Sequence, residues 1–258
     1  MNYESRTFAE CKKEHGNEYS NKYKGKLFSL LGDSISTLKG YSEPEDAEFY
    51  EGMRKFEANV FLPEDTWWGM TVDALGGKML VNNSFSGSTV CKKRGYMIPS
   101  YASSDERTSS LSRDDISPDV IMIYMGTNDW GSAIAPLPED AADESSPVFS
   151  LSYRSMLSKI KRNYPNAEIW CFTLGVSTYK NDESFSFPYK YAGRHIEEYC
   201  SVIRSCAKEY GCRIIDLYAE TSTLPFNSFD RFHPNDEGMK RISDAVISAL
   251  GKSYATAP

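Results

Sequence analysis

The sequence feature that most constrains the fold is a continuous apolar run at residues 120–125 (VIMIYM). Every residue in this run is apolar, so a strand formed here has no polar face to turn toward water. Strands of this kind are typical of parallel sheets that are covered by helices on both faces. Turn-forming residues follow at Gly126-Thr127-Asn128-Asp129 and mark the end of the strand. The run therefore predicts a buried parallel sheet at the centre of the molecule.

Further apolar runs alternate along the chain with segments whose apolar residues recur at helical spacing. This alternation predicts an α/β fold with right-handed crossovers and helices on both faces of the sheet. We find no internal repeat and no break in composition, so we expect one domain over residues 1–258, with a polar N-terminal arm at residues 1–24 and an insertion at about residues 35–62. Strands are expected near residues 26–32, 79–83, 119–125, 167–173 and 212–218, and helices near residues 67–75, 149–162, 196–210 and 235–250.

The first apolar run stops abruptly at Gly32-Asp33-Ser34. A strand that ends in such a turn holds Ser34 at the carboxyl edge of the sheet, where open α/β folds bind their ligands. Most Gly-Asp-Ser tripeptides are ordinary turns. A serine becomes a nucleophile only when a base removes its proton, and a histidine base works best when a carboxylate orients it. The remaining question is whether the chain supplies these partners.

His233 is the leading candidate for the base. Asp230 lies three residues before it, and on a tight turn its carboxylate can reach one imidazole nitrogen while the other nitrogen faces Ser34. The alternative is structural: Asp230 caps a turn and Pro234 opens a helix. His195 lies beside the apolar stripe of a predicted helix, where a packing role is expected.

A tetrahedral intermediate also needs preorganised donors for its oxyanion. The backbone N–H of Ser34 is one candidate. Gly87, in a loop of small residues, can offer its N–H without a side chain in the way, and Asn128 can offer its side-chain amide. The alternatives are a turn glycine at Gly87 and a loop amide at Asn128 that bonds its own backbone.

Four blocks of this sequence resemble, in order, those of the SGNH (GDSL-type) hydrolases. The blocks are Gly32-Asp33-Ser34, Asn82 with Ser86-Gly87, Gly126-Thr127-Asn128-Asp129, and Asp230-x-x-His233-Pro234. The resemblance extends from about residue 26 to residue 250. It implies a three-layer α/β/α flavodoxin-like fold with a five-stranded parallel sheet. It also implies site roles: Ser34 as nucleophile, Asp230 and His233 as the rest of a triad, and Ser34, Gly87 and Asn128 as oxyanion donors.

The resemblance favours a serine esterase that hydrolyses small acyl esters through an acyl-enzyme intermediate, without a metal or an organic cofactor. We expect a carbohydrate O-acetyl esterase, because aromatic side chains suit sugar rings. Alternatives are a short-chain ester or thioester hydrolase, a lysophospholipase, and a non-catalytic carbohydrate-binding protein on the same scaffold. A nucleotide binder is disfavoured, since no Gly-rich phosphate loop of recognised spacing follows the first strand. The candidate substrate-binding residues are Trp130, Trp67, Trp68, Tyr41 and Tyr179.

Trp67 and Trp68 are adjacent on a predicted helix and should point to different faces, so we expect at most one of them in the core.

The composition limits the kinds of binding partner and the cellular location that we expect. A net charge of −7 disfavours nucleic acid and anionic membranes as main ligands. No apolar run is long enough to span a bilayer, and the N-terminal segment lacks the apolar core of a signal peptide. We expect a cytoplasmic protein for the sequence as it stands, or a secreted one if a leader has been removed. The six cysteines are expected to be free thiols, and none has zinc-ligand spacing with histidine.

Overall fold

The central apolar run forms strand β3 (Val120–Tyr124), and all of its residues are buried. The computed structural model describes residues 22–43, 47–92, 100–179 and 190–255. Strand β3 lies between β1 (Leu27–Gly32) and β4 (Glu168–Phe172), and the edge strands are β2 (Lys78–Ser84) and β8 (Arg213–Ile215). The sheet has five strands in the order β2-β1-β3-β4-β8, and all of them run parallel. The predicted parallel sheet is therefore confirmed.

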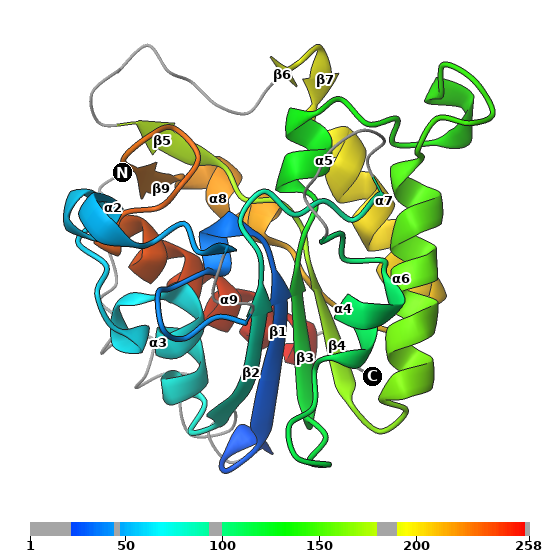
Figure 1. The fold of residues 1–258 in the computed structure, drawn as a ribbon. Helices are drawn as coiled ribbons and strands as arrows, with labels where there is room; N and C mark the ends of the chain where they lie inside the picture. The colour runs from blue at the N-terminus through cyan, green and yellow to red at the C-terminus, as the bar shows by residue number, and fades with distance from the viewer. Residues whose placement is uncertain (1–21, 44–46, 93–99, 180–189, 256–258) are drawn as a thin grey trace.

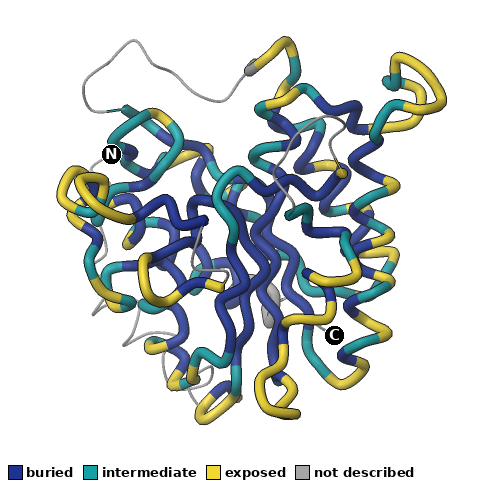
Figure 2. Tube along the Cα trace, viewed as in Figure 1, coloured by how far each residue is buried: buried dark blue, intermediate teal, exposed yellow. Residues whose placement is uncertain are grey.

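Helices cover both faces of this sheet (Figure 1). Helices α3 (Trp67–Ala74) and α9 (Asp236–Ala255) pack together on one face. Helix α6 (Phe149–Asn163) packs against α4 (Asp105–Ser109) and α7 (Ile196–Glu209) on the other. The three central strands β1, β3 and β4 are almost entirely buried, and the edge strands β2 and β8 are partly exposed (Figure 2). This is the three-layer α/β/α arrangement that the sequence predicted.

The register of the central strands sets the position of their loops. Gly32 at the end of β1 pairs with Ser84 of β2 on one side and with Tyr124 of β3 on the other. All three strands therefore end at the same level, and the loops that follow them begin side by side. The chain passes from β1 to β2 on one flank and then to β3 on the opposite flank, so the strand order reverses at β1. Ligands of open α/β sheets bind at such a point.

Smaller elements surround the carboxyl end of the sheet. Strands β5 (Ser177–Tyr179) and β9 (Phe226–Ser228) pair in parallel, and β6 (Lys190–Tyr191) and β7 (Arg194–His195) pair antiparallel. The remaining helical elements are η1 (Ser34–Ser36), α2 (Gly52–Ala58), η3 (Pro63–Asp65), α5 (Thr127–Gly131), η4 (Pro138–Asp140) and α8 (Leu217–Thr223). In the described residues, no helix has the length and apolar character needed to cross a membrane.

The predicted fifth strand is too long. Strand β8 ends at Ile215, because Asp216 begins a helix instead of continuing the sheet. The Asp216 carboxylate accepts a hydrogen bond from the backbone N–H of Ala219 at 3.2 Å and caps helix α8. Most of the predicted N-terminal arm, residues 1–21, lies outside the described residues.

The described cysteines are free thiols: Cys91, Cys171, Cys200, Cys206 and Cys212. Cys11 lies outside the described residues.

Both tryptophans of helix α3 are buried, so the expectation of at most one in the core is wrong. The Trp67 ring packs against Tyr124 and Phe172 of the sheet. The Trp68 side chain is only 3% exposed, and its indole N–H donates to the Ser36 carbonyl at 3.0 Å. The helix is covered on both sides, by the sheet and by the segment that follows Ser34, and this second cover explains the error.

Gly69 lets helix α3 approach the turn before it. Its N–H is capped by the Thr66 hydroxyl at 3.0 Å, and a Cβ at this position would lie 1.8 Å from the Pro63 carbonyl oxygen. Gly69→Ala should therefore destabilise the protein by about 2 kcal/mol, whereas alanine in an open helix would stabilise it. Urea denaturation measures the change. Unchanged or increased stability would contradict this close contact.

Candidate active site

Ser34 begins the turn that follows strand β1. Asp33 precedes it as the N-cap of η1, and the Asp33 Oδ1 accepts the backbone N–H of Ile35 at 3.1 Å. The turn is tight because Ser36 N–H already bonds back to the Asp33 carbonyl. Ser34 is 8% exposed and lines a small cleft. The strand end and the cap together hold its hydroxyl at the carboxyl edge of the sheet.

The Ser34 hydroxyl belongs to a hydrogen-bonded chain of three side chains. Its Oγ lies 2.8 Å from His233 Nε2, although the two residues are 199 positions apart. His233 Nδ1 lies 2.7 Å from Asp230 Oδ2. With Nδ1 donating its proton to the carboxylate, Nε2 is left to accept the proton of the serine hydroxyl. This arrangement can move a proton from Ser34 onto an imidazole whose positive charge Asp230 stabilises.

Asp230 is held in place by its own turn. Its Oδ1 accepts the backbone N–H groups of Phe232 at 3.1 Å and His233 at 2.8 Å. Burial alone would raise the pKa of Asp230, but the hydrogen bond and charge of His233 and these two N–H groups lower it below the usual range. The carboxylate therefore stays ionised beside the imidazole. Asp230 therefore both caps its own turn and contacts His233, whereas Pro234 does not open the helix, since α9 begins at Asp236.

The insertion after Ser34 contacts the histidine directly, which the sequence did not indicate. The Phe49 ring stacks on the His233 ring with centroids 3.4 Å apart and planes at 11°. Phe49 N–H donates to Thr37 Oγ1 at 2.7 Å, and Thr37 Oγ1 donates to the Ser34 carbonyl at 3.0 Å. The Ser34 turn and the Phe49 ring that covers His233 are thus linked through Thr37.

Of the two backbone N–H groups predicted as oxyanion donors, that of Ser34 belongs to a residue lining the small cleft, whereas Gly87 is not among the lining residues. Those of Ser34 and Gly87 find no acceptor among the residues that the structure describes. Asn128 Nδ2 donates one hydrogen to the Ser88 carbonyl at 2.9 Å, which fixes the orientation of the amide and leaves its second hydrogen free for another acceptor. These groups have the chemistry that an oxyanion requires.

The loops after β2 and β3 are tied together beside this amide. Asp129 is fully buried, and its carboxylate accepts the backbone N–H of Val90 at 2.8 Å and of Cys91 at 3.0 Å. Asn128 and Asp129 therefore bind consecutive parts of one loop, and Gly87 precedes that loop. Asp129, the residue after Asn128, therefore holds the Asn128 segment against the loop that follows β2.

The Ser34 cleft is small, with a volume of about 200 Å³. Its lining residues are Ser34, Ile35, Thr127, Asn128, Gly131, Ser132, Phe232 and His233. Within the described part of the chain, no group of three or more His, Cys, Asp or Glu side chains is arranged to hold a metal ion.

The aromatic residues predicted to bind substrate do not line this cleft. Trp67 and Trp68 lie in the core, where their indole N–H groups donate to the Ser36 hydroxyl at 3.3 Å and to the Ser36 carbonyl at 3.0 Å. Trp130 is 1% exposed, and its indole N–H donates to the Arg194 carbonyl at 3.0 Å. None of these three tryptophans lines the Ser34 cleft, because their rings are almost fully buried in packing.

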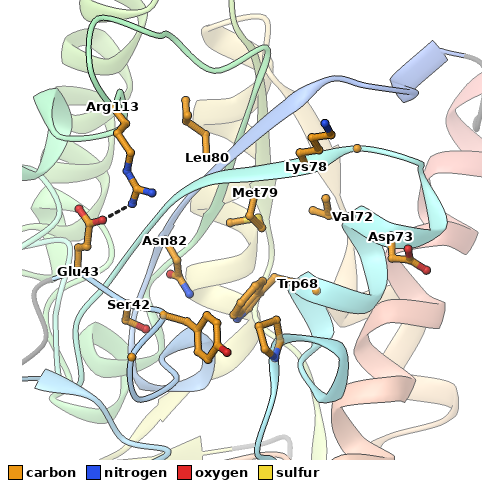
Figure 3. A pocket seen from close by; sticks show the side chains of 15 residues that line it. Ser42, Glu43, Trp68, Val72, Asp73, Lys78, Met79, Leu80, Asn82 and Arg113 are labelled. Carbon is orange, nitrogen blue, oxygen red and sulfur yellow. Dashed lines mark hydrogen bonds and ion pairs between the residues drawn. The ribbon is translucent and has the colours of Figure 1, made fainter.

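Tyr41 and Tyr179 also lie elsewhere. Tyr41 is 48% exposed and, with Trp68, lines a different cavity of about 440 Å³ beside edge strand β2 (Figure 3). That cavity carries the Glu43–Arg113 ion pair at its rim. Tyr179, in β5, lies under the Arg231 guanidinium at 5.5 Å from its ring centroid.

Asp33 is a fully buried carboxylate immediately before Ser34 in the chain. Burial raises its pKa from 3.8 to about 6, against the opposing influence of the Ile35 N–H, the His233 charge and the Thr127 hydroxyl. An unfolded chain releases this proton near pH 3.8, while the folded chain keeps it until about pH 6. Ionised Asp33 therefore destabilises the fold, and the penalty develops as pH rises through this window.

Asp33→Asn removes the ionisation and keeps an oxygen for the Ile35 N–H. We expect the variant to gain stability relative to the native chain as pH rises from 3.8 to about 6. The gain should reach up to about 3 kcal/mol above that window. Urea denaturation across this pH range measures the difference. A difference that is independent of pH, or that shrinks as pH rises, would contradict the assignment.

Comparison with known proteins bears on the family and the fold of this chain. The family model of GDSL-like lipases and acylhydrolases matches residues 26–186. A solved structure from Bacteroides ovatus, described as a GDSL-like lipase, is 25% identical, with a TM-score of 0.65 and coverage of 88% of this chain and 99% of that one. A search of curated proteins finds no match.

Two more distant structures share the fold. The aryl esterase of M. smegmatis is 15% identical, with a TM-score of 0.59 and coverage of 88% and 99% of the two chains. A family two carbohydrate esterase from Clostridium thermocellum is 15% identical, with a TM-score of 0.53 and coverage of 91% and 66%. Because the family model matches more than half of the chain, this protein belongs to the GDSL-like lipase/acylhydrolase family and is an enzyme that hydrolyses ester bonds.

Proposed function

We propose that this enzyme is a serine esterase that transfers a short acyl group from an ester to Ser34 and then to water. The observation that carries the proposal is the hydrogen-bonded chain from Ser34 through His233 to Asp230. A serine hydroxyl 2.8 Å from an imidazole nitrogen, with a carboxylate on the other nitrogen, has the geometry of an activated nucleophile.

In the first step, Ser34 Oγ attacks the ester carbonyl carbon while His233 Nε2 takes its proton. The carbonyl π electrons move to the oxygen, and the resulting oxyanion accepts hydrogen bonds from the N–H groups of Ser34 and Gly87 and from the Asn128 amide. The tetrahedral intermediate then collapses, the bond to the alcohol oxygen breaks, and His233 donates its proton to the departing alcohol. The acyl group stays on Ser34.

In the second step, a water molecule attacks the acyl carbon and His233 accepts its proton. The same donors hold the second oxyanion. Collapse releases the carboxylic acid, and the proton on His233 returns to Ser34 Oγ. Asp230 keeps its negative charge throughout and stabilises the imidazolium that forms in each half of the reaction.

The size of the cleft favours a short acyl group. Its volume of about 200 Å³ is smaller than a typical drug-sized pocket, which holds roughly 300 Å³ or more. An acetyl group fits this space, whereas a long acyl chain would extend beyond it. A lysophospholipase is therefore disfavoured. We propose acetate as the preferred acyl group.

For the alcohol we propose a carbohydrate. The polar side chains of Thr127 and Ser132 border the cleft and can hydrogen-bond to sugar hydroxyls. The carbohydrate esterase of Clostridium thermocellum has the same fold, and so does the aryl esterase of M. smegmatis. Acetylated sugars and aryl acetates compared side by side test this choice, and faster turnover of the aryl acetates would contradict it.

Ser34→Ala should abolish hydrolysis without unfolding the chain, because it removes only the Oγ. A fluorophosphonate probe followed by intact-mass spectrometry should give one adduct on the native enzyme and none on the variant. A non-catalytic carbohydrate-binding protein would bind sugar but form no adduct. Hydrolysis retained by Ser34→Ala would refute the nucleophile assignment.

Phe49→Leu should lower kcat/KM about tenfold, because the stacked ring that holds the His233 imidazole is lost. The matched control is Phe56→Leu. Phe56 lies on helix α2 of the same insertion, is 68% exposed and packs on Phe61 instead of His233. Steady-state kinetics should show the loss in the first variant only. Equal activities in both variants would show that the stack has no catalytic consequence.

A further inference from the structure

A buried arginine lies beneath the loops of the active site and takes no part in the steps above. Arg107, in helix α4, is 4% exposed. In the described part of the chain no carboxylate forms an ion pair with it, and its Nε is buried without a hydrogen-bond partner. Burial lowers its pKa to about 10, although the Asp33 charge opposes this change. A buried cation with incomplete partners is costly, and its presence calls for an explanation.

The Arg107 guanidinium joins the ends of two strands. Nη2 donates to the Gly32 carbonyl at 3.0 Å and to the Asn83 carbonyl at 2.8 Å. Gly32 ends β1 two residues before Ser34, and Asn83 lies next to the last residue of β2. One nitrogen atom therefore ties together the two strand ends from which the nucleophile turn and the Gly87 loop depart.

The other terminal nitrogen, Nη1, contacts the loop after β2 that contains Gly87 and Ser88. Arg107 Nη1 donates to Ser88 Oγ at 3.0 Å and also to the Ser100 hydroxyl. The Ser88 carbonyl accepts the Asn128 amide at 2.9 Å, and Gly87 is the residue before Ser88. Ser88 is fully buried, and its N–H also donates to the Phe85 carbonyl at 3.0 Å. A continuous path of hydrogen bonds and one residue of backbone runs from the guanidinium to the Asn128 amide.

We infer that Arg107 is a positioning residue for the oxyanion donors, which it holds in register with Ser34 through Ser88. The inference rests on the proposed function for the role of these donors. The planar fork of arginine suits the task, because it presents several donors in one plane to separate acceptors. A lysine at this position keeps the charge but cannot span the strand ends and Ser88 together.

The test compares Arg107→Met and Arg107→Lys with the control Asn163→Ala. Asn163 Nδ2 donates to the Thr108 carbonyl at 2.9 Å, so this control loosens helix α4 without touching the guanidinium contacts. The first readout is the ¹⁵N–¹H spectrum of the Asn128 side-chain amide, assigned by its loss in Asn128→Asp. The second is steady-state hydrolysis of p-nitrophenyl acetate, with thermal unfolding to establish that each variant is folded.

In both Arg107 variants we expect a shifted Asn128 amide signal and a kcat that falls about 100-fold, the scale of one lost oxyanion donor. KM should change by less than about threefold, because the donors act mainly in the transition state. The control should keep the native amide signal and kcat. An unchanged amide signal with native kcat in folded Arg107→Met would overturn the inference. Full rescue by lysine would also overturn it, as would equal losses in Asn163→Ala.

The two proposals fail differently. If the native protein hydrolyses no ester and takes no probe, the proposed function fails. A shifted Asn128 amide in Arg107→Met, with native signals in Asn163→Ala, would still support the positioning of the donor loop by Arg107.

Discussion

The site depends on the register of three parallel strands, β1, β2 and β3, whose carboxyl ends lie at the same level of the sheet. Gly32 pairs with Ser84 on one side and with Tyr124 on the other, so the loops after β1, β2 and β3 start from one line. The order of the strands reverses at β1, which leaves room there for a ligand. A change of register would separate the Ser34 turn from the Gly87 loop and from Asn128. The relative positions of these loops are therefore set by main-chain hydrogen bonds between the strands.

Around this edge, the reactive groups are held by residues that do not react. Phe49 covers the His233 ring, Asp129 ties two loops together, and the Arg107 guanidinium joins two strand ends to Ser88. Trp68 donates its indole N–H to the Ser36 carbonyl in the turn that begins at Ser34. Little of the site is left to loop conformation alone, and an oxyanion site works best when its donors need no rearrangement.

The sequence was sufficient for the sheet and for the loops that meet at its edge, because apolar runs and turn residues are local signals. It was insufficient where burial depends on distant segments. Trp67 is buried against the sheet, and Trp68 is also buried because residues after Ser34 cover its side of α3. Strand β8 ends earlier than its apolar run suggests, because Asp216 caps helix α8 instead of continuing the sheet. Phe49 and Arg107 lie in polar stretches and carry no local signal, since their importance comes only from partners far away in the chain.

The proposed mechanism requires an acyl group on Ser34 during turnover. Rapid acid quenching during hydrolysis of p-nitrophenyl acetate, followed by peptide mapping with mass spectrometry, tests it directly. We expect one acetyl group per chain, located on Ser34, which forms and decays at rates consistent with turnover. Steady hydrolysis with no acetyl group on Ser34, or with acetyl transferred to another side chain, would contradict it.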